Sequence, residues 1–258
     1  MKILVCVKQV PDMESRFKVD AEKTWYDEQD LAFRMNEYDE YAVEQAVQVK
    51  EQLGGAADIT ILSMGPDRVV EVIKKGLAMG GDRGVHVKDD RISRKDPWQV
   101  AGAIAAFARD KTFDLVFTGM QSQDRGSAQV GVTVAELLGC ACVTTLVSFE
   151  LSGESVIARR ELEGGMRAVV KVKLPAVLTC QLGLNHPRYP TLPNIMKARQ
   201  KELLTFPIAE FLTAEARITT EKMYLPEKKG HGLVLEGDIN ETADKLVAIL
   251  KEKTKVVR

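Results

Sequence analysis

The chain is 258 residues long, which is enough for one full α/β domain with appended segments. Apolar residues make up 45% and charged residues 28%, values that exclude an intrinsically disordered chain. The formal net charge of -1 offers no positive field for nucleic acid, and no apolar run reaches the roughly 18 residues of a membrane-spanning helix. We therefore expect a cytoplasmic protein with no nucleic-acid partner and no membrane insertion.

Short apolar runs alternate with longer amphipathic stretches through most of the chain. The pattern predicts strands at 2–8, 58–64, 84–88, 114–118 and 176–180, and helices at 37–53, 67–79, 97–110 and 128–138. Such alternation is typical of an α/β fold with a doubly wound, mostly parallel, Rossmann-like sheet. Two helix starts carry recognisable signals: Asn36 is the predicted cap of the first helix, and Asp96 followed by Pro97 begins the third.

The pattern changes after residue 144. Residues 144–174 predict an antiparallel meander, because two glycine-rich turns separate short β-rich runs. Prolines spaced three residues apart then predict an extended, stiff loop around residues 187–193. The charged tail contains one amphipathic helix near 240–252, whose apolar face requires a covering surface.

The most informative candidate binding loop is TGMQSQDRGSAQVG, residues 118–131, between a predicted strand and a predicted helix. In open α/β sheets, ligands bind at this end of the strands, where free helix amides attract phosphate. Gly119 and Gly126 allow a ligand to approach the backbone closely, and Arg125 can neutralise a phosphate. The alternative is a polar loop in which Ser127 caps the helix and no ligand binds.

Motifs of other nucleotide-binding and catalytic classes are absent from the sequence. No GxGxxG follows the first strand, and there is no GxxxxGKS/T loop, GxSxG elbow or HExxH. The histidines and cysteines lack metal-ligand spacing, and the cysteines fall in apolar runs, which predicts buried thiols. We therefore expect no catalytic residue and no metal site.

Apolar side chains gather on the proline-rich loop, where the prolines lower the entropy cost of holding an extended shape for a partner. The apolar candidate contact residues are Tyr189, Leu192, Ile195 and Met196, and Pro193 and Lys197 beside them complete the predicted docking set. The alternative is that these side chains pack onto their own domain.

Several segments together resemble the β subunits of electron-transfer flavoproteins: ILVCVKQVPD, MNEYDEYAVEQAVQVKE, TGMQSQDRGSAQVG and NHPRYPTLPNIMKA. The resemblance is strong over residues 1–201 and weak over the tail. It implies a non-enzymatic electron carrier, a heterodimer with an α subunit that holds most of a redox-active FAD, and a structural AMP. The carrier would take electrons from acyl-CoA or related dehydrogenases of fatty acid oxidation and pass them to a membrane quinone reductase.

The same resemblance implies site residues and a division of the chain. It places the nucleotide at Cys6, Asn36, Glu37, Tyr38, Asp39, Met64, Gly119, Met120, Gln121, Ser122, Gln123, Asp124, Arg125, Gly126, Ser127, Ala128, Gln129 and Val130. Met13, Tyr38 and Glu161 would lie near the flavin of the α subunit, and Leu192 would anchor the dehydrogenase. The parts would be a nucleotide-binding α/β domain at 1–183, a partner-recognition loop at 184–201, and an extension at 202–258 that packs on the α subunit.

Two other functions stay open. The AQVG sequence at 128–131 resembles bifurcating members, whose β subunit binds a second FAD and oxidises NADH. MNEYDEYAVE at 35–44 resembles members that bind AMP, which is the assignment we favour. A stand-alone nucleotide-binding regulatory protein is the third alternative, although the stiff apolar loop argues against it.

Overall fold

The computed structural model describes residues 1–227, 230 and 232–254. The chain divides into two compact units, Met1–Met223 and Tyr224–Arg258. The described part of the second unit contains α6 (Ile239–Lys253), which begins after Asp238, whose carboxylate accepts hydrogen bonds from two amides of the first turn. The helix predicted near 240–252 is thus confirmed. Among the described residues, no helix combines the length and apolar character needed to cross a membrane.

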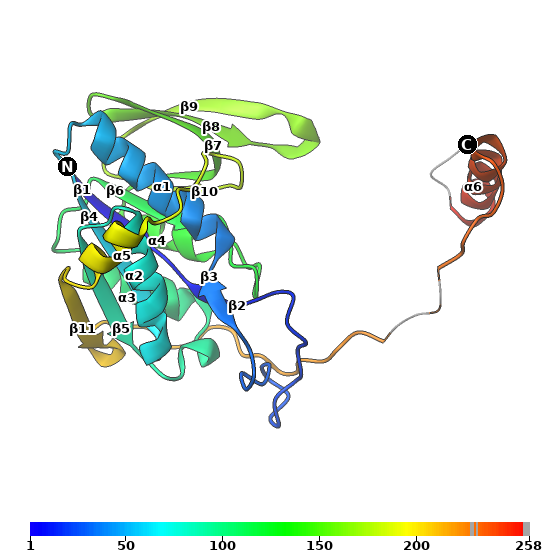
Figure 1. Ribbon diagram of the computed structural model, residues 1–258, viewed down its shortest axis with the longest axis horizontal. Coiled ribbons are helices and arrows are strands. Elements are labelled where there is room, and N and C mark those ends of the chain that lie inside the picture. The colour runs from blue at the N-terminus through cyan, green and yellow to red at the C-terminus, as the bar shows by residue number, and fades with distance from the viewer. Residues whose placement is uncertain (228–229, 231, 255–258) are drawn as a thin grey trace. The chain divides into compact units, whose positions relative to one another are not determined.

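A nine-stranded sheet forms the centre of the first unit, in the order β11-β5-β4-β1-β6-β10-β7-β8-β9 (Figure 1). Its strands are β1 (Lys2–Cys6), β4 (Asp58–Gly65), β5 (Arg83–Lys88), β6 (Leu115–Gly119), β7 (Ala141–Ser152), β8 (Ser155–Glu161), β9 (Arg167–Lys173), β10 (Ala176–Cys180) and β11 (Leu203–Pro207). Pairing is parallel from β11 to β7 and antiparallel from β7 to β9. The predicted mostly parallel sheet with an antiparallel meander is confirmed. A separate hairpin joins β2 (Gln9–Pro11) to β3 (Phe33–Met35).

Helices cover both faces of the sheet. They are α1 (Glu37–Gln52), α2 (Val70–Met79), α3 (Pro97–Ala108), α4 (Val130–Leu138) and the short α5 (Leu192–Ala198). Because successive side chains of a strand point to opposite faces, β1 contributes to two cores. Ile3 and Val5 pack with residues of α1 and α2, whereas Leu4 packs with residues of α3 and α4. The central parallel strands β1, β4, β6 and β10 are therefore buried on both sides, as expected for a doubly wound fold.

One predicted helix cap is confirmed and the other is wrong. The Asp96 carboxylate accepts a hydrogen bond from the amide of Gln99 at 2.8 Å, and Pro97 occupies the first turn of α3. Asn36 precedes α1, but its side chain makes no hydrogen bond to the amides of that helix. Its amide group is instead engaged with a distant loop.

The prediction of an extended loop around residues 187–193 is only partly right, because α5 begins at Leu192. The Thr191 side chain accepts a hydrogen bond from the amide of Asn194, and Pro193 lies in the first helical turn. Proline is tolerated there because the amide that it lacks has no helical acceptor. The third proline of the series thus marks a helix start.

All four cysteines are free thiols, but not all are buried. Cys6 and Cys180 are buried as predicted, whereas Cys140 is partly exposed and Cys142 is exposed. The prediction is wrong for Cys142 because β7 is at least partly accessible along most of its length. Within the part of the chain that the structure describes, no group of His, Cys, Asp or Glu side chains is arranged to hold a metal ion.

Candidate functional site

A cavity opens where β1, β4 and β6 end. Its lining includes Cys6 and Lys8 at the end of β1, Met64 of β4, Thr118 of β6 and Val130 at the start of α4. The strand β1 lies between β4 and β6. The next strands of the sheet in the chain, β4 and β5, lie on one side of β1, and β6 lies on the other side. This is the topological switch point at which open α/β sheets bind ligands. The unpaired amides at the start of α4 make it suited to an anionic group.

A buried carboxylate joins the ends of β1 and β6. The Asp39 Oδ2 atom accepts a hydrogen bond from the amide of Lys8 at 2.7 Å, and Oδ1 accepts one from the amide of Gly119 at 2.9 Å. Burial raises the pKa of Asp39 to about 7, although both amides favour the ionised form. A Cβ atom on Gly119 would collide with the Asp39 carboxylate and lie 2.7 Å from the Cβ of Tyr38. Gly119 is therefore needed for α1 to pack against β6.

Asn36 fastens the loop after β6 to the start of α1. Its Nδ2 donates to the carbonyl of Gln121 at 2.9 Å, and its Oδ1 accepts from the amide of Gln123 at 3.0 Å. Two side-chain contacts add to this attachment: Gln121 donates to the Tyr38 hydroxyl, and Gln123 donates to Glu37. The first turn of α1 thus fixes the shape of the loop.

An ion pair between Lys8 and Asp124 lies in the cavity wall. The Nζ–Oδ1 distance is 2.6 Å, and the Asp124 side chain is only 3% exposed. Lys8 Nζ also donates to the Ser122 hydroxyl at 3.3 Å. Burial lowers the pKa of Lys8, while Asp124 opposes that shift. The pair places a cation beside the loop that leads into α4.

Arg125 connects the same loop to two other segments. Its guanidinium carbon lies 4.5 Å from the centre of the Trp25 ring, a cation–π contact. Its terminal nitrogens donate to the carbonyls of Lys95, at 3.1 Å, and Ser93. In the structure the guanidinium of Arg125 binds these carbonyls and closes the cavity wall, and the phosphate partner predicted for it from the sequence stays a prediction.

The remaining wall of the cavity is largely apolar, with Leu62, Ile92 and Ile104 among its side chains. Two lining residues, Trp25 and Arg68, each have a buried Nε atom without a hydrogen-bond partner among the described residues. A buried donor without an acceptor destabilises a protein by about 1–3 kcal/mol, so a ligand oxygen or ring nitrogen would be favoured there. The apolar wall, the unpaired donors and the start of α4 together fit an adenine nucleotide.

Most of the residues that the resemblance places at the nucleotide lie around this one cavity. Those in its lining are Cys6, Asn36, Asp39, Met64, Gly119, Met120, Gln121, Ser122, Asp124, Arg125, Ser127, Ala128, Gln129 and Val130. Glu37, Tyr38, Gln123 and Gly126 are not part of the lining. Ser127 does not cap α4, because the residue that precedes this helix is Gln129 and no side chain caps it.

Several lining residues were not predicted from the sequence. They are Val7, Lys8, Trp25, Tyr26, Glu28, Leu62, Arg68, Ile92, Ser93, Lys95, Pro97, Val100 and Ile104; Thr118 and Gly131, which also line the cavity, are the ends of the predicted binding loop. Lys8 is the last residue of the predicted first strand and lies two residues beyond the end of β1, so the rule that ligands bind beyond strand ends could have found it. Trp25 comes from an irregular loop and Ser93 from a single 3-10 turn, where no periodicity indicates which side chains turn inward.

The three residues predicted near a flavin lie on different elements. Met13 lies in the loop after β2, Tyr38 lies in the first turn of α1, and Glu161 is the last residue of β8. The Glu161 carboxylate accepts a hydrogen bond from the side chain of Gln181 at 3.0 Å. Their role toward a flavin stays a prediction.

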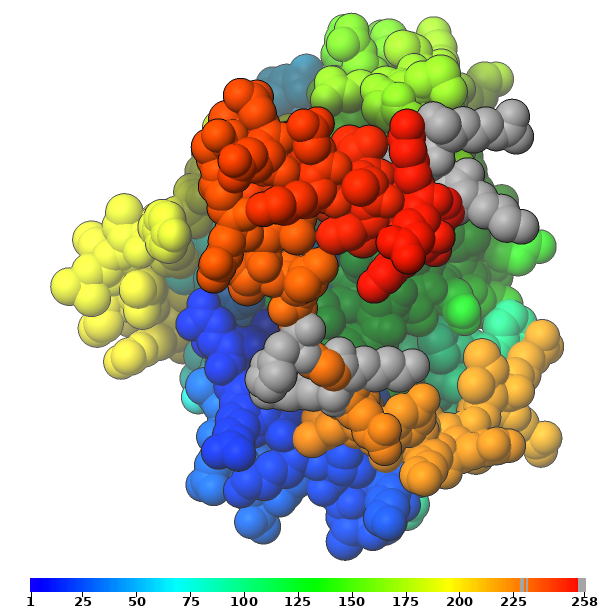
Figure 2. Space-filling model, turned by 90° about the vertical axis from the view of Figure 1, so that its right-hand side faces the viewer, coloured from blue at the N-terminus to red at the C-terminus, as the bar shows by residue number. Residues whose placement is uncertain are grey.

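The predicted contact residues at 189–197, here called the docking segment, are on the surface of the first unit. Tyr189 is 93% exposed, Leu192 72% and Met196 54%; Ile195, Pro193 and Lys197 are exposed as well. Figure 2 shows this part of the chain, in yellow, projecting to one side of the neighbouring elements. The alternative that these apolar side chains pack onto their own domain is therefore wrong for Tyr189, Leu192 and Met196.

Comparisons with known proteins agree with this architecture. A family model described as the electron transfer flavoprotein domain matches residues 23–211. Proteins named electron transfer flavoprotein subunit beta from Methylophilus methylotrophus and Bacillus subtilis are 36% and 35% identical, over 98% and 100% of both chains. The human protein of that name is 34% identical over 98% of this chain and 97% of its own. The chain therefore belongs to the electron transfer flavoprotein family and matches its β subunits along its whole length.

Proposed function

We propose that this chain pairs with an α subunit to form a cytoplasmic electron-transfer flavoprotein, and that its cavity holds a structural AMP. The observation that carries the proposal is the cavity at the end of β1 and β6, where an apolar wall meets the start of α4 and the cation of Lys8. Apolar surface suits an adenine ring, and helix amides with a lysine suit a phosphate. FAD, shared with the α subunit, supplies the redox chemistry when bound.

The chain's own residues would bind and orient in this proposal. Lys8 and the first turn of α4 would bind the AMP phosphate, and Trp25 and Arg68 would donate hydrogen bonds to the nucleotide through their free Nε atoms. Met13, Tyr38 and Glu161 would border the flavin of the α subunit. No side chain is required to form a covalent bond, which fits an electron carrier rather than an enzyme.

The docking segment would contact the dehydrogenase that delivers electrons. Its exposed apolar side chains lie on a short helix and its proline-containing lead-in, a shape that inserts readily into a groove. An acyl-CoA dehydrogenase would donate the electrons, and a membrane quinone reductase would accept them. A stand-alone regulatory protein would have no evident use for such a surface.

A second candidate function is electron bifurcation with a second FAD in the cavity. It is favoured by the sequence Ala128-Gln129-Val130-Gly131 at the start of α4. Gly131 packs tightly in the fold, since a Cβ there would lie 2.6 Å from Thr179 Cγ2 and 2.7 Å from Thr118 Oγ1. That packing accounts for the glycine without a second flavin, so we place AMP first.

The decisive experiment is the cofactor content of the complex. The chain is co-expressed with the α subunit of its own organism, the complex is purified and denatured, and released FAD and AMP are quantified. We expect one FAD and one AMP per heterodimer. Two FAD without AMP would establish the bifurcating alternative, and a chain that forms no complex and carries no flavin would contradict both.

A further inference from the structure

The docking segment has almost no core of its own. Every residue of α5 before Ala198 is exposed, and Ala198 alone is buried against the core with α1 and α2. A helix of this length is not stable in isolation, because nucleation is costly and few hydrogen bonds form. The order of the docking segment must therefore come from the residues that attach its two ends.

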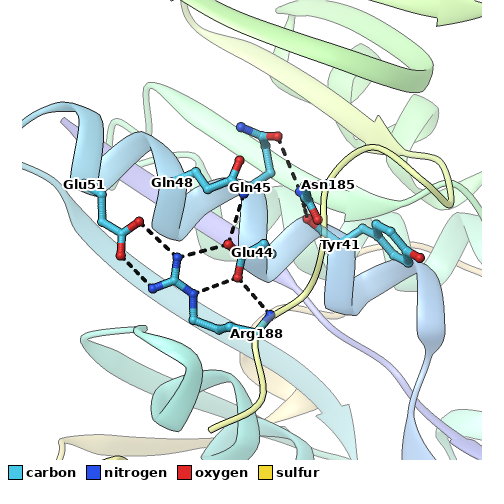
Figure 3. Close-up of polar contacts among 7 residues, drawn as sticks. All are labelled: Tyr41, Glu44, Gln45, Gln48, Glu51, Asn185 and Arg188. Atoms are coloured by element: carbon cyan, nitrogen blue, oxygen red, sulfur yellow. Dashed lines mark hydrogen bonds and ion pairs between the residues drawn. The ribbon is translucent and has the colours of Figure 1, made fainter.

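A charged clamp attaches the leading end to α1 (Figure 3). Arg188 donates from Nε and Nη2 to the Glu44 carboxylate at 2.8 and 3.0 Å, and from Nη1 and Nη2 to the Glu51 carboxylate at 2.6 and 3.0 Å. The backbone amide of Arg188 also donates to Glu44 at 3.2 Å. One guanidinium thus grips two carboxylates on the same helix, directly before Tyr189.

The two carboxylates differ in exposure. The Glu44 side chain is 4% exposed, whereas the Glu51 side chain is 57% exposed. An exposed ion pair contributes little because solvent screens it, but a buried carboxylate that loses its cation is left uncompensated. The contact with Glu44 should therefore fix the position of Arg188, and the contact with Glu51 should orient the rest of its guanidinium.

Neighbouring contacts reinforce both ends of the docking segment. Asn185 Nδ2 donates to the carbonyl of Tyr41 at 3.0 Å, a second attachment to α1 (Figure 3). After the segment, Lys201 Nζ donates to the carbonyls of Leu77 and Gly81 at 2.9 and 2.5 Å. These carbonyls lie at the carboxyl end of α2, where a cation is favourable. The docking segment is thus attached at its leading end to α1 and at its trailing end to α2.

We propose that Arg188, gripped by Glu44 and Glu51, is a positioning residue that holds the docking segment in the orientation needed to bind a dehydrogenase. The inference rests on the proposed function, because it assigns a device to the docking surface. A segment that is ordered before contact loses little conformational entropy on binding. Without the clamp, only a fraction of molecules would present the segment correctly, and the apparent affinity would fall by that fraction.

The test uses the complete flavoprotein complex and a purified acyl-CoA dehydrogenase of the same organism that reduces the wild-type complex. We expect Arg188→Met to raise the KM for the complex about tenfold while kcat and FAD content stay unchanged. Arg188→Lys should raise KM less, because an ammonium group can pair with Glu44 but cannot bind both carboxylates as a planar fork. Arg83→Met is the matched control, since it also removes an arginine from two carboxylates, those of Asp58 and Glu202, in exposed ion pairs.

Leu192→Ala separates the failure of this inference from failure of the proposed function. If Leu192→Ala raises KM but Arg188→Met does not, the clamp is not a positioning device, although the docking surface stands. If neither variant changes KM, the docking surface itself is refuted and the clamp loses its role. Should Arg188→Met lower the FAD content, Arg188→Lys carries the test, and an unchanged KM in that variant overturns the inference.

Hydrogen exchange supplies a readout that requires no dehydrogenase. In the Arg188→Met complex, amides of residues 188–198 should exchange at least about tenfold faster, while those in the middle of α1 keep their protection. Faster exchange throughout α1 would indicate a general structural role and would overturn the assignment of Arg188 to positioning. Unchanged exchange in residues 188–198 would do the same.

Discussion

The nucleotide cavity and the docking segment are held by different kinds of contact. The cavity wall is formed by residues at the ends of the sheet strands, and the buried carboxylate of Asp39 links the ends of β1 and β6 through hydrogen bonds. The docking segment lies on the surface and depends on side chains at its ends, chiefly Arg188 and Lys201. A cofactor site of this kind shares the stability of the core, whereas a recognition surface can be altered without unfolding the protein. Substitutions should therefore separate the two regions.

The largest loss of stability should come from Gly119→Ala, a substitution in the wall of the nucleotide cavity. The new methyl group would collide with Asp39 and with Tyr38 Cβ, so α1 and β6 would have to separate. We expect the free energy of unfolding of the complex to fall by about 3 kcal/mol, with loss of bound nucleotide. Denaturant unfolding and nucleotide content after purification measure both.

The control for that substitution is Gly102→Ala in α3. Its Cβ would meet only the Cβ of Ala214, at an ordinary 3.7 Å, and alanine favours a helix interior over glycine. Its stability should be equal to or greater than that of the wild type. Equal destabilisation by the two substitutions would show that crowding at Gly119 is not the cause.

Leu192→Ala should have the opposite effect: it should weaken binding to the dehydrogenase and leave the stability of the complex unchanged. Leu192 is 72% exposed, so truncation should leave the free energy of unfolding and the FAD content unchanged. Loss of a desolvated apolar anchor should weaken binding to the dehydrogenase by about 2 kcal/mol, which corresponds to a roughly 30-fold higher KM. Steady-state reduction of the complex by the dehydrogenase measures this. Leu204→Ala, a partly exposed leucine on β11, is the control, and an equal KM for both variants would contradict the docking assignment.

Local signals in the sequence were sufficient for most of the central sheet and its helices, although they missed β11 and the β2–β3 hairpin. The cap at Asp96 acts three residues along the chain, on the amide of Gln99, so its spacing is visible in the sequence. The alternation of apolar runs likewise reflects which side chains of each strand and helix are buried in the core. These features predict the order of elements because each depends on neighbours in the chain.

The candidate site depends on contacts between distant parts of the chain, and there the sequence was less informative. The Asn36 side chain binds Gln121 and Gln123, which are 85 and 87 residues away, so a local capping role was the natural but wrong interpretation. Trp25 meets Arg125 across a similar separation, from a loop without periodicity. The resemblance to a family supplied the loop residues, but the supporting cation of Lys8 and the Arg188 clamp needed the three-dimensional structure.

A pH experiment on Asp39 sharpens the comparison with the smallest expected effect. Burial raises the pKa of this carboxyl to about 7 in the folded chain, from 3.8 in its absence. Between these values the folded state retains a proton that the unfolded state has lost, so stability falls as the pH rises and levels off above pH 7. We expect the wild-type complex to lose about 1 kcal/mol of stability relative to Asp39→Asn between pH 6 and pH 7, where the folded carboxyl with its raised pKa gives up its proton. Thermal midpoints of both complexes across this range measure the difference, with Glu202→Gln, an exposed carboxylate, as the control. Parallel curves of stability against pH for the wild type and Asp39→Asn would refute the raised pKa. Since the docking segment does not touch Asp39, the KM for the dehydrogenase should not follow the pH dependence of the stability.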